Sequence, residues 1–156
     1  MKPRLTAAAG LALAIFLAGS LVLLLGGNGR AAVVHTCSAT DRQFIGAAQL
    51  NMAALSSLAE DYLHGNADAA DVIQQTQTSR TVLHNTSPSD PSLSKTRAIL
   101  RAMFLEYGRA IRADQHKHNP GKYIYRAYGL ANFAHDVLAK AKPALAERGC
   151  DISPLL

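Results

Sequence analysis

Apolar residues recur at intervals of three and four in four successive segments of this chain, and this spacing constrains the fold more than any other feature. In the first segment, the recurring apolar residues are Ile45, Ala48, Met52, Leu55, Ala59 and Tyr62. One face of an α-helix has this spacing, whereas a half-buried strand would alternate apolar and polar residues. Thr40 with Gln43 is typical of a capping box at the start of such a helix, and Gly65 can end it in a left-handed conformation.

Three further segments show the same periodicity. The second covers about residues 68–84 and is polar and rich in threonine, so it is the weakest helix former of the four. The third opens at Asp90 and Pro91, an N-cap residue followed by proline at the first helical position. The fourth begins near Lys122, and we expect Pro143 to kink or restart it.

These segments predict an all-α domain over residues 31–156. Short connections between amphipathic helices favour antiparallel neighbours, so the expected architecture is an antiparallel up-down-up-down four-helix bundle. The two cysteines give an independent argument, because Cys37 precedes the first helical segment and Cys150 follows the fourth. An even number of antiparallel helices brings these ends together, whereas three or five helices would leave them a helix length apart. Only the even number allows a disulfide, which needs Cα atoms about 4.4–6.8 Å apart. We therefore predict a disulfide bond between Cys37 and Cys150.

An uncharged apolar run precedes this domain and predicts an N-terminal hydrophobic helix within residues 1–30. The run over residues 7–25 is close to the roughly 20 residues of a membrane-spanning helix, whereas a signal-peptide core usually has about 7–15. Length therefore favours a membrane anchor, and a signal peptide cleaved near Ala31 is the alternative. Lys2 and Arg4 lie before the run, which predicts a cytoplasmic N-terminus. We expect a single-pass protein of the cell membrane with its C-terminal domain outside the cytoplasm, or a secreted protein if the segment is cleaved.

The formal net charge of +5 is weak evidence for a nucleic-acid partner. Three of the basic residues, Lys2, Arg4 and Arg30, flank the apolar run rather than belonging to the domain. Because we expect the domain to be exported, we do not expect it to bind nucleic acid.

The sequence lacks the motifs of several enzyme classes. It contains no H-E-x-x-H, no G-x-x-x-x-G-K-[ST], no G-x-G-x-x-G and no G-x-S-x-G. A di-iron site in a helix bundle needs Glu-x-x-His pairs, and none of Glu60, Glu106 and Glu147 has a histidine three residues later. We therefore do not expect an enzyme, and we expect no cofactor in the leading interpretation.

The third segment carries arginines on the arc opposite its apolar face. They are Arg97, Arg101, Arg109 and Arg112. A solvated helix face accounts for such a pattern, and the alternative is a surface that docks a partner or anionic lipid headgroups.

Histidines and tyrosines gather around the stretch DQHKHNPGKYIYRAY, residues 114–128. In the expected bundle, the end of the first helix lies at the same end of the domain as this stretch. The candidate ligand-binding residues are Tyr62, His64, His116, His118 and Tyr125. Imidazoles and phenols are ligands of metals and of haem iron, although the identity of a metal is not indicated. A solvent-exposed turn between two helices is the alternative interpretation.

Several short stretches bear on this alternative: Cys37 before the first helix, DYLHGN at its end, HNP before the last helix, and KPALAERGCDISPLL at the end of the chain. Together they resemble the small secreted helical haemophores of mycobacteria, which bind haem. The resemblance implies that Tyr62 contacts haem, that His64 is the histidine that follows it, and that His116 or His118 is the histidine before Asn-Pro. In the family pattern that first histidine follows the tyrosine by four residues, whereas His64 follows Tyr62 by two.

The leading interpretation is an extracytoplasmic binding protein, membrane-anchored or secreted, that docks a protein partner at or near the membrane. The membrane contact would be made through residues 7–25. The alternative is a haemophore-like carrier of haem or of a metal.

Overall fold

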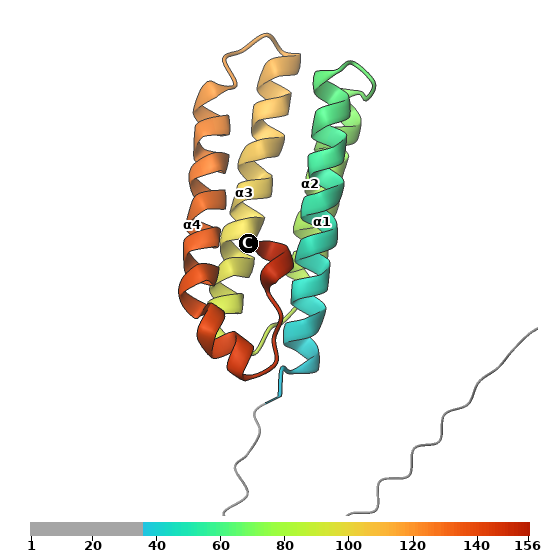
Figure 1. Cartoon of the computed structure of the whole chain (residues 1–156). Helices are drawn as coiled ribbons and strands as arrows, with labels where there is room; N and C mark the ends of the chain where they lie inside the picture. The colour runs from blue at the N-terminus through green and yellow to red at the C-terminus, as the bar shows by residue number, and fades with distance from the viewer. Residues whose placement is uncertain (1–35) are drawn as a thin grey trace, which may run out of the picture. The chain divides into compact units, whose positions relative to one another are not determined.

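The computed structural model describes residues 36–156, which form four α-helices and one short 3-10 helix, with no strand within this range (Figure 1). The elements are α1 (Ala39–Leu63), α2 (Ala69–His84), α3 (Pro91–Gln115), α4 (Gly121–Glu147) and η1 (Ser153–Leu155). The predicted all-α class is confirmed, and the four helices pack against each other. The predicted hydrophobic helix, the anchor or signal peptide, and the cleavage position near Ala31 lie outside the described residues. None of the helices from residue 36 onward combines the length and the hydropathy needed to cross a bilayer.

The start of α1 differs from the predicted capping box. The N-cap is Ser38, whose hydroxyl accepts a hydrogen bond from the backbone N–H of Asp41 at 3.0 Å, so Thr40 lies inside the first turn. The earlier start places Asp41 where its carboxylate accepts hydrogen bonds from the loop before α3. The prediction for α3 is confirmed, because Asp90 is its N-cap and Pro91 its first residue. Pro143 does not restart the fourth helix, because α4 runs unbroken through it from Gly121 to Glu147.

Three helices end with a residue in the left-handed region. Gly65 after α1 and Gly149 after α4 have φ angles of 74° and 71°, as expected for glycine at this position. After α3 the corresponding residue is Lys117, with a φ of 58°. A side chain in this conformation costs roughly 1–2 kcal/mol, so the turn between α3 and α4 is held against a local preference.

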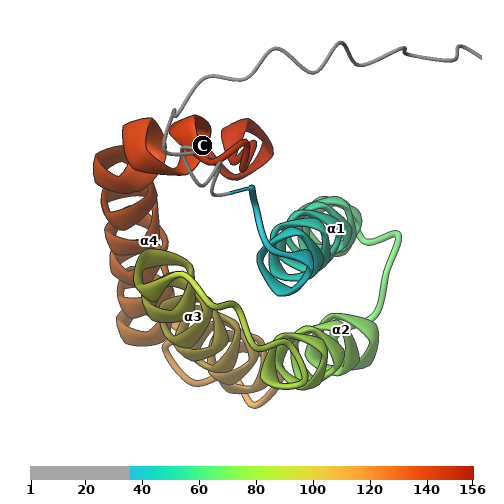
Figure 2. The same ribbon diagram turned by 90° about the horizontal axis from the view of Figure 1, so that it is seen from below.

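The helices form an arc rather than a closed ring. α3 packs against both α2 and α4, and α1 packs against α2 and, less extensively, α3. Figure 2 shows the arc running from α1 through α2 and α3 to α4, with the C-terminal segment on the side between α1 and α4. The largest fully buried side chains come from all four helices and from the C-terminal segment: Phe44, Leu83, Phe104, Leu145 and Ile152. Within the described part, α1 and α4 do not make a contact comparable to those of the other neighbouring helices.

One end of the domain is held by covalent and polar links. The predicted disulfide between Cys37 and Cys150 is confirmed, with a Cα separation of 4.9 Å. The buried Asp41 carboxylate accepts from the backbone N–H groups of Ser89 and Asp90 at 2.7 and 3.0 Å. Asp90 in turn pairs with Arg148 just after α4. These links bring together the start of α1, the start of α3 and the end of α4.

Candidate functional site

An apolar groove lies between α1 and α4, on the open side of the arc. Met103 and Tyr107 of α3 form its floor, and its volume is about 450 Å³. The wall on α1 includes Met52 and Leu63, and small side chains line much of both walls, among them Ala59, Ala127 and Ala131. Ligand-binding pockets are usually concave, mostly apolar and about 300–1,000 Å³ in volume, and this groove has those properties.

The rims of the groove expose large apolar side chains. Leu63 on α1 is 81% exposed and Tyr128 on α4 is 66% exposed, and Ile124 lies near them on the α4 side. Among the described residues that line the groove, Glu60 is the one that carries a charge. Exposed apolar side chains beside an apolar hollow are typical of an interaction surface.

We call the space between α1 and α4 on the open side of the arc the seam. The groove takes up one part of the seam, and the C-terminal segment lies in the neighbouring part. Ile152 is 2% exposed, η1 contacts α1, and Leu155 packs against the core. Leu155 and Leu156 line a hollow that shares Met52 and Ala131 with the groove, so the groove continues from the place where this segment lies. Figure 1 shows the segment rising between α1 and α4 from the disulfide end. The seam between α1 and α4 therefore already accepts one short, apolar, helical piece of chain.

The floor of the groove is electrically neutral. Burial raises the pKa of the Tyr107 phenol above its ordinary value, so the hydroxyl stays protonated at neutral pH. With the thioethers of Met52 and Met103, this gives a soft, adaptable surface with one hydroxyl at its base. Such a surface can hold an apolar side chain or a flat apolar ligand.

The predicted ligand residues do not share one cavity. The Tyr62 hydroxyl donates a hydrogen bond to the Asp114 carboxylate at 2.6 Å, and this bond, with some burial, raises the pKa of Tyr62. His64 is an exposed C-cap residue of α1, and Tyr125 is 81% exposed. His116 and His118 lie together on the turn after α3, with ring centroids 6.4 Å apart. Within residues 36–156, no group of three or more His, Cys, Asp or Glu side chains is placed to hold a metal ion.

The four predicted arginines fall into two pairs. Arg97 donates to the backbone carbonyl of Thr86, and Arg101 lies beside Arg80 of α2. Arg109 and Arg112 lie nearer the other end of α3, where both line a hollow at the α3–α4 turn. Arg109 is exposed, whereas the other three arginines are half-buried.

Sequence reasoning did not find the groove. Met52, Leu55 and Ala59 lie on the apolar face that the spacing predicts for the first helix, and Ala127 and Ala131 recur at helical spacing in the fourth segment. The periodicity of those residues shows that each face is apolar, but it does not show whether the two faces meet. Leu63 follows Ala59 by four residues and Tyr128 follows Ile124 by four, so both extend apolar faces to the rims of the groove and are the signal in the sequence.

Comparisons with protein-family models, with curated proteins and with solved structures found no match for this chain. The class of protein is therefore defined by its own features: an all-helical, disulfide-linked domain with an open apolar groove between its first and fourth helices.

Proposed function

We propose that this protein is an extracytoplasmic helical binding protein whose α1–α4 groove receives a short apolar helical segment of a protein partner at or near the membrane. In this proposal residues 7–25 form the hydrophobic helix that anchors the chain, or the core of a signal peptide. The four helices alternate in direction, up-down-up-down. The Tyr62–Asp114 hydrogen bond joins the C-terminal ends of α1 and α3, and the Cys37–Cys150 disulfide joins the start of α1 to the end of α4. Both links support that order.

The observation that carries the proposal is the segment already lying in the seam. Ile152 and Leu155, three residues apart, pack an apolar helical turn against α1 and the core. A partner helix that presents apolar residues at intervals of three and four would make the same kind of contact further along the seam. The seam is therefore suited to a helix rather than to an extended strand, because within residues 36–156 no sheet edge is present to pair with one.

The length of the groove sets the size of the partner segment. Its lining residues on α1 run from Met52 to Leu63, which is about 16 Å along a helix that rises 1.5 Å per residue. This is room for about three turns, or roughly ten residues, of a partner helix. Full burial of a side chain such as Leu63 is worth about 1.5–3 kcal/mol relative to exposure, so a few such contacts can support specific binding.

The test is a pair of matched double substitutions in the full chain. Leu63→Glu with Tyr128→Glu places two charges at the rims of the groove, whereas Leu50→Glu with Tyr125→Glu makes the same changes on the same two helices away from it. Both pairs should leave the free energy of unfolding nearly unchanged, because all four side chains are exposed. Partner recovery should be measured by quantitative co-purification from native membranes.

The groove pair should abolish the recovery of a specific partner, and the control pair should retain it. Equal recovery with both pairs would overturn the proposed use of the groove.

Haem binding is a second candidate, and the composition of the groove favours it. Tyr107, Met52 and Met103 line the groove, and tyrosine and methionine are known axial ligands of haem iron. The resemblance to haemophores points instead to Tyr62, which is engaged with Asp114. A haem titration followed by the Soret band separates the two. Loss of the Soret shift in Tyr107→Phe favours haem in the groove, and loss of the shift in Tyr62→Phe favours a haemophore-like site. If the wild type shows no Soret shift, haem binding is rejected.

A further inference from the structure

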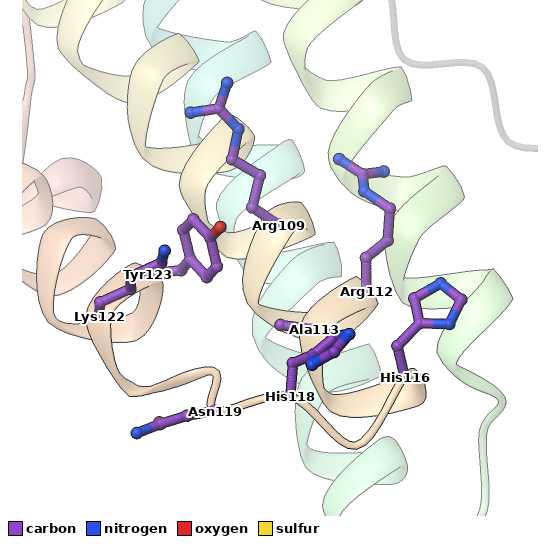
Figure 3. A pocket seen from close by; sticks show the side chains of 8 residues that line it. All are labelled: Arg109, Arg112, Ala113, His116, His118, Asn119, Lys122 and Tyr123. Atoms are coloured by element: carbon purple, nitrogen blue, oxygen red, sulfur yellow. The ribbon is translucent and has the colours of Figure 1, made fainter.

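A second hollow, of about 600 Å³, lies at the turn between α3 and α4. Its charged and imidazole side chains are Arg109, Arg112, His116, His118 and Lys122, and we call it the basic pocket. Figure 3 shows the two arginines extending from α3, the histidines from the turn that follows, and Lys122 from the start of α4. Among the described residues, none of those lining this pocket is a carboxylate.

The turn that carries the histidines is built in an unfavourable backbone conformation. Lys117, between His116 and His118, has a φ of 58°, where glycine is the usual residue. The His118 N–H donates to the Ala113 carbonyl at 2.8 Å, which completes the end of α3 and fixes the turn. The surrounding hydrogen bonds therefore hold Lys117 in this conformation and fix the positions from which the two histidines extend.

The start of α4 adds hydrogen-bond donors on the other side of the pocket. The Asn119 side-chain oxygen accepts from the Gly121 N–H at 2.8 Å, which leaves the Asn119 amide group available to donate. The first turn of α4 contains no acidic residue, so the positive end of its helix dipole is not offset by a side chain there. The Lys122 ammonium group lies 4.7 Å from the centre of the Tyr123 ring, and this cation–π contact holds it near the pocket.

Part of the charge of the pocket is already paired. Arg109 forms an ion pair with Glu106 at 2.5 Å, so its guanidinium is partly used. Arg112 and Lys122 form no ion pair within residues 36–156. The pocket therefore offers two basic side chains that form no ion pair among the described residues, two imidazoles and an amide donor. This set suits a ligand with several oxyanion oxygens better than a single carboxylate.

We propose that the basic pocket binds a phosphate-bearing ligand, with Arg112 and Lys122 as the principal contacts and His116, His118 and Asn119 as hydrogen-bond donors. This site is separate from the α1–α4 groove and does not depend on its function. The phosphate group can belong to a soluble phosphate compound or to the headgroup of a lipid, since both present the same oxygens.

The experiment uses the full chain in a nonionic maltoside detergent at low salt. Isothermal titration with inorganic pyrophosphate tests the soluble source, and micelles doped with phosphatidylglycerol, compared with phosphatidylcholine, test the lipid source. Amide chemical shifts of residues 115–123 report whether binding occurs at the turn. The test variant is Arg112→Gln with Lys122→Gln, and the matched control is Lys140→Gln with Lys142→Gln, which removes the same charge from exposed positions on α4.

We expect the test variant to lose at least about tenfold in affinity, because a hydrogen bond to a charged group is commonly worth a factor of ten or more. The control should change affinity by less than about threefold, the effect of screened long-range charge. Pyrophosphate binding identifies the soluble source, and binding to phosphatidylglycerol micelles alone identifies the lipid source. Equal losses in both variants, shifts away from the turn, or no wild-type binding of either probe at about 1 mM would overturn the proposal.

Discussion

Removing the buried Asp41 carboxylate should destabilise the domain strongly. The side chain is 3% exposed and accepts hydrogen bonds from Ser89 N, Ser89 Oγ and Asp90 N at 2.7, 2.8 and 3.0 Å. A hydrogen bond to a charged group contributes about 1.5–3 kcal/mol, and a buried donor left without a partner costs about 1–3 kcal/mol. Because the three bonds share one carboxylate and water can replace part of them, we expect a loss of about 3–4 kcal/mol for Asp41→Ala.

A graded pair of substitutions makes this expectation sharper. In Asp41→Asn the remaining carbonyl oxygen can still accept from the backbone, and the new amide group can donate to Ser89 Oγ, so the loss should be about 1–2 kcal/mol. Asp136→Ala is the matched control, because the Asp136 side chain is 68% exposed and its distance to the His135 imidazole is 3.9 Å. The free energy of unfolding of the control should stay within about 0.5 kcal/mol of the wild-type value. Urea unfolding followed by far-ultraviolet circular dichroism measures all three, with the m-value expected to stay constant.

The same carboxylate should make stability depend on pH. Burial opposes ionisation of Asp41, but the hydrogen bonds from Asp90, Ser38 and Ser89 outweigh it and hold the pKa below its ordinary value of 3.8. A carboxyl whose pKa is lowered on folding stabilises the protein above the unfolded pKa, and this contribution is lost as pH falls through the folded pKa. The difference in free energy of unfolding between the wild type and Asp41→Ala should therefore become smaller as the pH falls from 7 to below 3.8. A loss under about 1 kcal/mol at pH 7, or a difference that widens in acid, would refute this reasoning.

Four further predictions concern the backbone and the disulfide. Lys117→Gly should stabilise the protein by about 0.5–1 kcal/mol in urea unfolding. Glycine removes the cost of a side chain in the left-handed region, and this gain exceeds the entropy that glycine adds to the unfolded chain. A lower urea concentration at the unfolding midpoint would contradict this prediction. Gly108→Ala should destabilise it by about 1–3 kcal/mol, because the new Cβ would meet the Thr76 hydroxyl oxygen at 2.6 Å. Gly129→Ala, with no atom within 4 Å of its Cβ, should instead stabilise it by about 0.5–1 kcal/mol, and equal signs in thermal unfolding would count against both. Reduction of the disulfide, whose cysteines are 113 residues apart, should cost about 4–5 kcal/mol, and a change under about 1 kcal/mol in urea unfolding would exclude a major stabilising role.

The features that could be predicted from the sequence depend on local spacing and on whether the number of helices is even or odd. Asp90 with Pro91 marked the start of α3, and the even number of helices predicted the Cys37–Cys150 disulfide. The start of α1 was misplaced because Ser38 and Thr40 are both good N-cap residues. The interaction that distinguishes them is the hydrogen bonding of Asp41 to a loop 48 residues away.

The candidate site depended on information that periodicity does not contain. Tyr62 and His116 do lie at the same end of the domain, but the Tyr62 hydroxyl is directed to Asp114 rather than to the histidines. The groove exists because α1 and α4 do not meet along the whole seam, and part of that seam is filled by Ile152 from beyond the last long helix. A helical repeat identifies an apolar face but not the element that covers it.

Site-specific photo-cross-linking in native membranes is the sharpest test of the proposal that the α1–α4 groove receives an apolar helical segment of a partner. A benzoylphenylalanine in place of Ala59 lies in the groove, and the same group in place of Leu50 lies on α1 outside it. We expect a cross-link from position 59 that mass spectrometry maps to a partner segment of roughly ten residues with apolar side chains at helical spacing. We expect no such product from position 50. Cross-links of equal yield from both positions, or a product from position 59 that maps to a polar, non-helical segment, would contradict it.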